Sequence, residues 1–472
     1  MPPVDSAVRE ILEAHGQTHV LRFQDDLNED ERRALLGQIE SVDFELVERL
    51  VETWVRRQPS PERFERIEPV PVIPPAELGR PDAREAWDAG EEALRQGRVG
   101  LVLVAGGQGT RLGFEGPKGA YPIGPVSNRT LFEYHADKIH NVQRRYGCRL
   151  PWYIMVSESN DEATQRFFRE NDYFGLEPRD ILFFRQGMMP CVDADGKLML
   201  EAPGRLAMNP NGHGGCIPGM VDNGVVRDAD ERGVDTLSYF QVDNWAVKVA
   251  DPFFLGYHLL RGGEMSSKVH RKNHPRESVG VHCLCDGEYR VIEYTELDIY
   301  PQLLELDDDG RLKHFAGNPA IHIISTGFVK RVYDHFDRFP WHCAHKKVPY
   351  VDDEGKTVSP EQPNAYKFET FVFDVLRYIG HEPVALEIHR QGEYTPIKQY
   401  EGSNSVVAAR ESMNRHWAEW LEAAGHRVPR TDGGVPAINI EISPRLALWK
   451  EEFVGKAAGR SWPMDRDLWI EG

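Results

Sequence analysis

The sequence predicts an α/β protein with a doubly wound, mixed sheet, a helical N-terminal part and a small C-terminal α+β domain. Short apolar runs without alternation occur at residues 101–105, 152–157 and 237–243, which is typical of strands buried on both faces. Amphipathic segments with helical spacing separate these runs, and the connections are short. This alternation of strand and helix indicates a sheet that is covered by helices on both sides.

The remaining elements follow in chain order. Residues 1–95 show apolar side chains at helical spacing and are predicted to be helical, with the proline-containing segment 71–81 as a connection. Thr130 can cap a helix that ends at Gly147. Further elements are a strand at 180–186, a helix at 252–260, hairpin strands within 267–330, a helix near 408–425 and a strand at 438–443. We therefore predict domains at 1–95, 96–390 and 391–472.

The composition excludes several classes of protein. The 472 residues carry 56 Lys and Arg against 75 Asp and Glu, a net charge of −19 that disfavours binding to nucleic acid or to anionic membranes. No apolar stretch has the roughly 18 residues that a membrane span needs. Six cysteines are too few for a disulfide scaffold, and Cys283 and Cys285 are predicted to share one face of a strand. We expect a reduced, cytoplasmic protein.

Residues 105–119, AGGQGTRLGFEGPKG, directly follow the first buried strand. Ligands of open α/β sheets bind beyond the carboxyl ends of the strands. The glycines let backbone N–H groups approach a ligand, and Arg111 and Lys118 add two cations, which suits a triphosphate. A dinucleotide fingerprint is excluded because counting from Gly107 places Leu112 at the last glycine position. A P-loop is excluded because no Ser or Thr follows Lys118.

The segment AGGQGTRLG followed by PKG resembles the signature of the UTP-dependent sugar-1-phosphate uridylyltransferases. In detail it is similar to the eukaryotic-type UDP-N-acetylhexosamine pyrophosphorylases. The resemblance extends from about Val99 to beyond the IEISP segment at 441. Supporting matches are QGMMPCVD at 186–193, VDNWAVKVADP at 242–252, VIEYTEL at 291–297, HKKVPYVD at 345–352 and KFETFVFDVL at 367–376. The resemblance implies a Rossmann-like nucleotidyltransferase core.

The resemblance also implies roles for charged residues. Arg111 and Lys118 would hold the leaving pyrophosphate, and Lys398, in YTPIKQ, would meet the attacking phosphate. Lys367 is a second candidate for a phosphate contact, although a solvated side chain explains it equally well. Asp243 ends the predicted strand 237–243, at the ligand edge of the sheet, and would bind Mg²⁺ or Mn²⁺ together with phosphate oxygens.

Uridine and sugar contacts are implied in the same way. Gly106, Gly107, Gln186 and Gly212 would hold uridine, since the glutamine amide can donate and accept at the uracil edge. The loop NPNGHGG departs from the family pattern P-D-G-N-G-G, because Asn211 and His213 replace its Asp and Asn. His213 either keeps a hydrogen bond to the sugar or phosphate or is an exposed loop histidine.

Two further residues are expected at the sugar. Glu293 alternates with Val291 and Tyr289, so it is predicted to share their strand face and to need a partner such as a sugar hydroxyl. Asn318 resembles the family asparagine that binds the N-acetyl sugar. The family's second amide is absent, because Ile321 stands in its place.

The predicted reaction is UTP + N-acetylhexosamine 1-phosphate → UDP-N-acetylhexosamine + pyrophosphate, with UTP and the sugar phosphate as the partners. One alternative is the same chemistry on glucose 1-phosphate or another sugar 1-phosphate. The other is a non-catalytic nucleotide sensor with the same fold. Retention of Arg111, Lys118 and Asp243 argues against the sensor.

Overall fold

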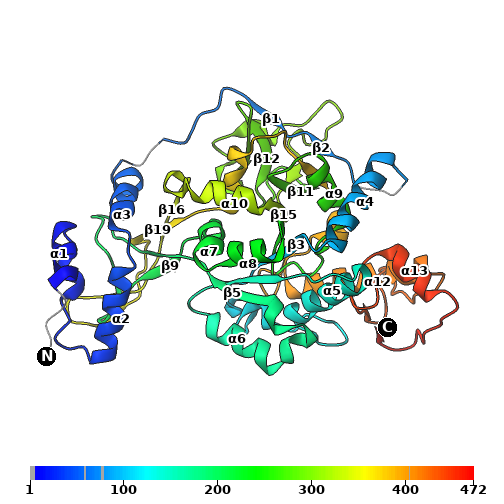
Figure 1. Cartoon of the computed structure of the whole chain (residues 1–472), viewed down its shortest axis with the longest axis horizontal. Helices are drawn as coiled ribbons and strands as arrows, with labels where there is room; N and C mark the ends of the chain where they lie inside the picture. Colours follow the sequence, from blue (N-terminus) through cyan, green and yellow to red (C-terminus); the bar gives the residue numbers. More distant parts are fainter. Residues whose placement is uncertain (1–5, 58–59, 76–78, 403, 472) are drawn as a thin grey trace. The chain divides into compact units, whose positions relative to one another are not determined.

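The structure is a computed structural model that describes residues 6–57, 60–75, 79–402 and 404–471. The chain forms two compact units (Figure 1). The smaller unit comprises Met1–Arg63, Gln186–Cys216 and Asp337–Asp374, and the larger comprises Phe64–Arg185, Ile217–Phe336 and Val375–Gly472. The domain boundaries expected near residues 95 and 390 remain a prediction.

The larger unit is built on one extended mixed sheet. Along its main path the strands are β1 (Ile67–Pro69), β12 (Val281–Cys285), β14 (Ala316–Gly317), β11 (Met265–Arg271), β15 (His322–Ser325), β10 (Thr236–Gln241), β3 (Val99–Val104), β4 (Trp152–Val156) and β5 (Ile181–Arg185). Strand β13 (Glu288–Ile292) pairs with β12, and β20 (Ala385–Glu387) joins β11 to β2 (Val72–Ile73).

Four neighbouring strands of this sheet, β10, β3, β4 and β5, run parallel. The residues of β3, β4 and β10 are almost all buried, as the apolar runs in the sequence predict for strands covered on both faces, whereas the outer strand β5 is only partly buried. Strand β15 then pairs antiparallel with both β10 and β11, which makes the sheet mixed. The carboxyl ends of β3, β4 and β10 therefore meet at one edge.

Helices cover this sheet. In the larger unit they are α4 (Pro81–Arg95), α5 (Leu131–Tyr146), α6 (Asp161–Glu170), α8 (Val225–Arg232), α9 (Pro252–Leu260), α10 (Thr326–Tyr333), α11 (Arg390–Glu393), α12 (Val406–Ala423) and α13 (Lys450–Ala457). Helix α7 (Cys216–Asp222) begins at the last residue of a smaller-unit segment. As predicted, Thr130 caps α5 with its side chain, and Gly147 ends the helix in the left-handed region at φ +62°.

Helices α4 and α9 lie in very close contact (Figure 1). A Cβ atom on Gly90 would lie 2.0 Å from the carbonyl oxygen of Pro252, and one on Gly256 would lie 1.7 Å from that of Ala86. Only glycine permits this approach of one helix backbone to another.

The expectation that residues 1–95 are helical outside the connection 71–81 is wrong at Ile67–Pro69, and the connection itself is not free of regular structure. Ile67–Pro69 and Val72–Ile73 form strands β1 and β2, which pair with β12 and β20. The prolines of this segment disfavour the helical conformation of the residues before them, and proline is tolerated in edge strands. The segment 71–81, predicted as a connection, thus contributes a strand, and its residues 76–78 lie outside the described residues.

The hairpin and the C-terminal elements agree with the prediction. Strands β12 and β13 are joined by Asp286 and Gly287, both with positive φ (51° and 88°), as a type I′ turn requires. Strand β21 (Ile440–Ile442) pairs parallel with β22 (Leu468–Ile470). The predicted fold class, an α/β core with helical N-terminal and α+β C-terminal parts, is confirmed.

The smaller unit combines helices with short two-stranded sheets. Its helices are α1 (Ser6–Ala14), α2 (Glu29–Glu40) and α3 (Phe44–Leu50), followed by a π-helical turn at Val51–Arg56. Its antiparallel pairs are β6 (Met188–Pro190) with β9 (Met208–Pro210), β7 (Leu200–Ala202) with β8 (Arg205–Leu206), β16 (His342–Lys346) with β19 (Ala365–Glu369), and β17 (Tyr350–Val351) with β18 (Thr357–Val358).

The cysteines are all free thiols, as expected. Cys283 and Cys285 lie on one face of β12 with their sulfur atoms 3.6 Å apart, which confirms the predicted strand geometry. Within the described residues, no helix combines the length and the apolar character that crossing a bilayer requires.

Candidate active site

The glycine loop after β3 is held by side chains that follow β4. The Nδ2 group of Asn160 donates to the carbonyl oxygens of Ala105 (2.8 Å) and Gly107 (3.2 Å), and Ser157 Oγ donates to that of Gly106 (2.8 Å). Within the described part of the chain, no hydrogen bond uses the N–H group of Gly106 or Gly107. The carbonyls are thus fixed while the N–H groups remain available to an anion.

An ion cluster lies at the same edge of the sheet. Asp243 Oδ2 accepts hydrogen bonds from Lys118 Nζ at 3.0 Å and from Lys398 Nζ at 2.7 Å. The Asp243 side chain is only 6% exposed and that of Lys118 15%, whereas that of Lys398 is 45% exposed. Strand β10 ends at Gln241, so Asp243 lies two residues beyond the strand rather than at its last position, but at the predicted edge.

The electrostatics of the cluster favour the ionised carboxylate. Burial opposes ionisation of Asp243, but the charges and hydrogen bonds of Lys398 and Lys118 outweigh it and hold the pKa of Asp243 well below its ordinary value. Burial likewise lowers the pKa of Lys398, but the nearby Asp243 outweighs it and the net shift is upward. The charge of exposed Arg111 also acts on Lys398. Three cations against one carboxylate leave the site positive and suited to phosphates.

The residues present fit a divalent cation held at one protein oxygen. Within the described residues no group of three His, Cys, Asp or Glu side chains is arranged to hold a metal. Asp243 Oδ2 is engaged by both lysines, and no hydrogen bond among the described residues uses its Oδ1. Mg²⁺ often takes one or two carboxylate oxygens and completes its shell with water and substrate phosphates, so a single free carboxylate oxygen suffices.

The loop that carries Asp243 is fastened by residues that the sequence analysis missed. Asn244 Nδ2 donates to Glu393 O at 2.8 Å, and its Oδ1 accepts from Thr395 N at 3.0 Å. The backbone N–H of Ile397 donates to Asp243 O at 3.0 Å. These bonds join the Asp243 loop to the segment that leads to Lys398. The position of Asn244 directly after the carboxylate was the available signal.

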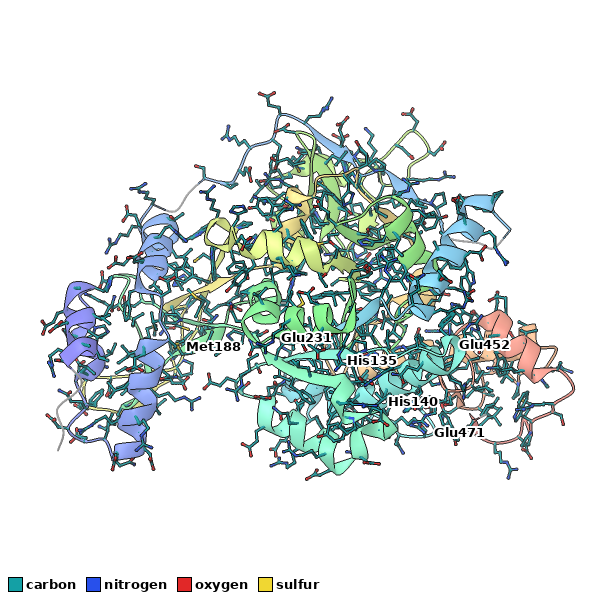
Figure 2. All side chains as sticks on the ribbon, in the orientation of Figure 1. His135, His140, Met188, Glu231, Glu452 and Glu471 are labelled. Atoms are coloured by element: carbon teal, nitrogen blue, oxygen red, sulfur yellow. The ribbon has the colours of Figure 1, made fainter. Side chains whose placement is uncertain are left out.

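A buried histidine supports the same loop from helix α5. His135 lies in the interior of the larger unit (Figure 2) and donates from Nε2 to Val242 O at 3.1 Å. Burial, with the charge of Lys138, lowers the pKa of His135 to about 3, so the ring is neutral and keeps its role as a single donor.

The residues expected at the sugar lie together around Gly280. A Cβ atom on Gly280 would lie 3.0 Å from Glu293 Oε1, and Asn318 N donates to Gly280 O at 2.9 Å. Glu293 is not on the strand face as expected, because β13 ends at Ile292. Glu293 instead caps the following 3₁₀ turn, where its carboxylate accepts a hydrogen bond from the backbone N–H of Glu296. Asn318 Oδ1 accepts from Ala320 N at 2.9 Å.

The remaining predicted contacts lie in the smaller unit. Gln186 is 9% and Asn211 6% exposed, and Asn211 N donates to Gly187 O at 3.0 Å. The Oδ1 atom of Asn211 is buried without a hydrogen-bond partner among the described residues. Gly212 has φ +84°, and its Cβ would lie 2.3 Å from Thr370 O, so only glycine fits. Gln186 and the 211–212 turn are thus brought together.

His213 and Lys367 also belong to this unit. His213 Nδ1 accepts from Val372 N at 3.1 Å, and its ring stacks on Phe371 with centroids 5.3 Å apart. The ring is therefore an ordered part of the loop rather than a freely exposed histidine. Lys367 lies on strand β19, half-buried, opposite Ala344.

A glycine loop at the carboxyl edge of a parallel sheet, beside three cations and one carboxylate, defines a nucleotidyltransferase. The family model described as UTP–glucose-1-phosphate uridylyltransferase matches residues 44–416, and the chain belongs to this family. The family resemblance seen in the sequence is confirmed, and with it the class of enzyme, a UTP-dependent uridylyltransferase.

Individual relatives are similar over at least 80% of their length. The human UDP-N-acetylhexosamine pyrophosphorylase-like protein 1 is 38% identical and covers 96% of this chain and 95% of its own. The yeast (Saccharomyces cerevisiae) UDP-N-acetylglucosamine pyrophosphorylase is 37% identical, with 80% of each chain covered. The crystal structure of the Trypanosoma brucei UDP-N-acetylglucosamine pyrophosphorylase, 25% identical, superposes with a TM-score of 0.83 over 99% of this chain and 98% of its own.

Proposed function

We propose that this enzyme transfers the uridylyl group of UTP to N-acetylhexosamine 1-phosphate. An oxygen of the sugar phosphate forms a bond to the α-phosphorus of UTP, the bond from that phosphorus to the bridging oxygen of the β-phosphate breaks, and pyrophosphate leaves with the electron pair. The observation that carries the proposal is the Lys118–Asp243–Lys398 cluster beside the free N–H groups of the glycine loop.

The cations divide between the two phosphate groups. Arg111 and Lys118, on the glycine loop, would neutralise the charge that develops on pyrophosphate, and Lys398 would hold the attacking phosphate. Such transfers depend mainly on positioning and charge stabilisation. A Mg²⁺ ion on Asp243, when bound, would neutralise phosphate charge.

The choice of an N-acetylhexosamine rests on the names of the relatives and on Asn318 beside Glu293. Glucose 1-phosphate is the second candidate, because Ile321 stands where the family pattern has an amide. The cytoplasmic location expected from the sequence remains a prediction.

A panel of sugar 1-phosphates tests the proposal. Pyrophosphate release from UTP should be fastest with N-acetylglucosamine 1-phosphate, and Asp243→Asn should abolish it. Release that is fastest with glucose 1-phosphate would replace the proposed sugar. No release with any sugar phosphate, from folded protein that still binds UTP, would leave only a nucleotide sensor.

A further inference from the structure

Lys268, on strand β11, is a fully buried charged side chain in the larger unit. Its Nζ atom donates to Asp251 Oδ2 at 2.6 Å and also to Glu393 Oε2. Asp251 ends the loop between β10 and α9, the loop that carries Asp243, and Glu393 begins the segment that leads to Lys398. One ammonium group therefore links the Asp243 loop to the segment of Lys398.

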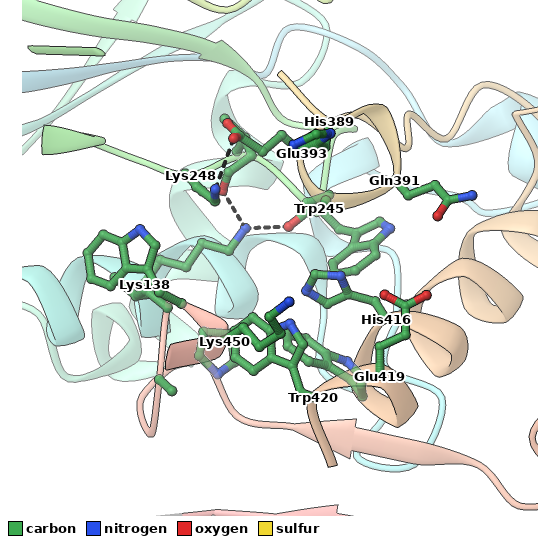
Figure 3. A pocket seen from close by; sticks show the side chains of 18 of the residues that line it. Lys138, Trp245, Lys248, His389, Gln391, Glu393, His416, Glu419, Trp420 and Lys450 are labelled. Atoms are coloured by element: carbon green, nitrogen blue, oxygen red, sulfur yellow. Dashed lines mark hydrogen bonds and ion pairs between the residues drawn. The ribbon is translucent and has the colours of Figure 1, made fainter. Parts of the chain in front are cut away.

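A second lysine adds to this link. Lys248, within the Asp243 loop, pairs with Glu393 Oε1 at 3.0 Å (Figure 3). Burial opposes ionisation of Glu393, but the charges of Lys248 and Lys268 outweigh it and lower the pKa of Glu393 to about 2. The two lysines and the carboxylates of Asp251 and Glu393 thus form a group without net charge, which we call the Lys268 network.

Packing does not hold the segment that leads to Lys398 on one of its sides. Residues of this segment line a pocket of about 440 Å³ behind the loop that carries Asp243 (Figure 3), among them Gln391, Gly392 and Glu393. A surface that faces a cavity has no neighbouring atoms to keep it in place. The Lys268 network supplies a constraint that packing lacks on this side.

The backbone of the Asp243 loop is strained next to Asp251. Ala250 has φ +47°, in the left-handed region that a residue with a Cβ atom rarely adopts. Such a conformation persists only where the surrounding structure enforces it. Asp251 is held through both of its oxygens, because Oδ2 accepts from Lys268 and Oδ1 accepts from the N–H group of Phe253 at 3.2 Å.

Stability alone does not account for the Lys268 network. Buried ion pairs gain little net free energy, because the cost of removing charges from water offsets their attraction, and apolar residues of similar volume are often as stabilising. The charges do supply a fixed separation between two chain segments. These segments carry Asp243 Oδ2 and Lys398 Nζ, which lie 2.7 Å apart.

We propose that Lys268 is a positioning residue for uridylyl transfer, which holds Asp243 and Lys398 at the required separation through Asp251 and Glu393. The inference rests on the proposed function, in which Asp243 and Lys398 meet the reacting phosphates. Lys268 is too deeply buried to touch the substrates. Its removal should therefore lower kcat much more than it raises KM for UTP, the substrate of the glycine loop.

Lys268→Met tests the proposal in the full chain, because methionine keeps an unbranched apolar side chain and removes the charge. We expect kcat for pyrophosphate release, per folded protein, to fall about tenfold or more. KM for UTP should change by less than about threefold. Amide hydrogen exchange at Thr395 and Ile397, which donate to Asn244 Oδ1 and Asp243 O, should become about tenfold faster.

Arg232→Met is the matched control. Arg232 also bridges two carboxylates, those of Asp180 and Asp228, each at 2.7 Å. Asp180 directly precedes β5, so this bridge lies at the amino ends of the parallel strands, away from the ion cluster. Both variants should unfold at lower urea concentrations than the wild type, but only Lys268→Met should lose kcat.

A double variant separates position from stability. Adding Glu393→Gln to Lys268→Met leaves one lysine with one carboxylate, so part of the lost stability should return. The link between the two segments stays broken, and kcat should remain about tenfold or more below that of the wild type.

Three results would overturn the proposal and leave the proposed function standing. These are wild-type kcat or wild-type amide exchange in folded Lys268→Met, an equal loss of kcat in Arg232→Met, and recovery of kcat together with stability in the double variant. A wild-type protein that releases no pyrophosphate with any sugar phosphate would instead refute the proposed function, and this inference with it.

Discussion

Replacing Asn244 by alanine separates the Asp243 loop from the segment that leads to Lys398. The asparagine is 2% exposed and bonds through both atoms of its amide to the backbone of Glu393 and Thr395, at 2.8 and 3.0 Å. Alanine removes both bonds and leaves a carbonyl oxygen and an N–H group without these partners at a largely buried position.

The stability cost follows from these two bonds. Each lost hydrogen bond costs about 1 kcal/mol, and a buried group left unsatisfied costs about 1–3 kcal/mol. We therefore expect the free energy of unfolding to fall by about 2–4 kcal/mol. The catalytic cost is separate, because a shifted loop no longer holds Asp243 Oδ2 at 2.7 Å from Lys398 Nζ. A displacement of about 1 Å can cost roughly 100-fold in rate, so we expect kcat to fall about 10- to 100-fold.

Asn414→Ala is the matched control. Asn414 is 7% exposed, donates to Ile438 O at 3.0 Å and accepts from Ile440 N at 2.7 Å, and within the described residues its side chain makes no hydrogen bond to either segment of the ion cluster. Urea unfolding should give similar losses of stability for the two variants. Pyrophosphate release at saturating substrates, expressed per folded protein, should fall only for Asn244→Ala.

Equal kcat values for the two variants, at similar losses of unfolding free energy, would refute the positioning role. A graded response would support it further. Asn244→Asp keeps the acceptor for Thr395 N but cannot donate to Glu393 O, so its kcat should lie between those of the wild type and Asn244→Ala.

Arg111→Ala should lower kcat roughly 100-fold, because one transition-state donor is worth about that much, and steady-state rates near the wild-type value would exclude Arg111 from the site. Excess EDTA should abolish pyrophosphate release and Mg²⁺ should restore it, whereas full activity in EDTA would contradict a metal on Asp243. His213→Asn should increase the preference in kcat/KM for N-acetylglucosamine 1-phosphate over glucose 1-phosphate. An unchanged ratio of the two kcat/KM values would show that this histidine does not take part in sugar selection. Burial lowers the pKa of Lys138 from 10.5 to about 7, so above pH 7 the native state releases a proton that the unfolded chain keeps. The free energy of unfolding from urea titrations should therefore rise with pH, by about 2 kcal/mol between pH 7 and 9. Lys138→Met should flatten this rise, and a variant whose free energy of unfolding rises as steeply with pH would contradict the lowered pKa of Lys138.

The sequence alone determined the elements of the core and the edge at which the site lies. Buried strands β3, β4 and β10 appear as apolar runs because both of their faces are covered, and a cap at Thr130 with a glycine at 147 marks a helix locally. Parallel strands place their carboxyl ends at one edge, so the glycine loop and Asp243 could be assigned to the same edge.

The local sequence pattern did not predict the secondary structure of segments whose conformation depends on residues far away in the chain. Strands β1 and β2 lie in a proline-containing segment whose extended form is stabilised by partners more than 200 residues away in β12 and β20. The alternating pattern up to Glu293 predicts that this residue belongs to the strand, but the strand ends at Ile292 and the carboxylate of Glu293 accepts from the backbone N–H of Glu296 in the next turn.

Only the tertiary structure showed what surrounds the site residues. Lys398 reaches Asp243 across 155 residues of sequence, and the position of Asn244 beside Asp243 did not reveal that its side chain bonds to the backbone of Glu393 and Thr395. The pocket behind the loop likewise depends on where helices α5, α11 and α12 pack. Periodicity and capping are properties of neighbouring residues and are written in the sequence, whereas a hydrogen bond or a cavity between distant segments exists only once the core has brought those segments together.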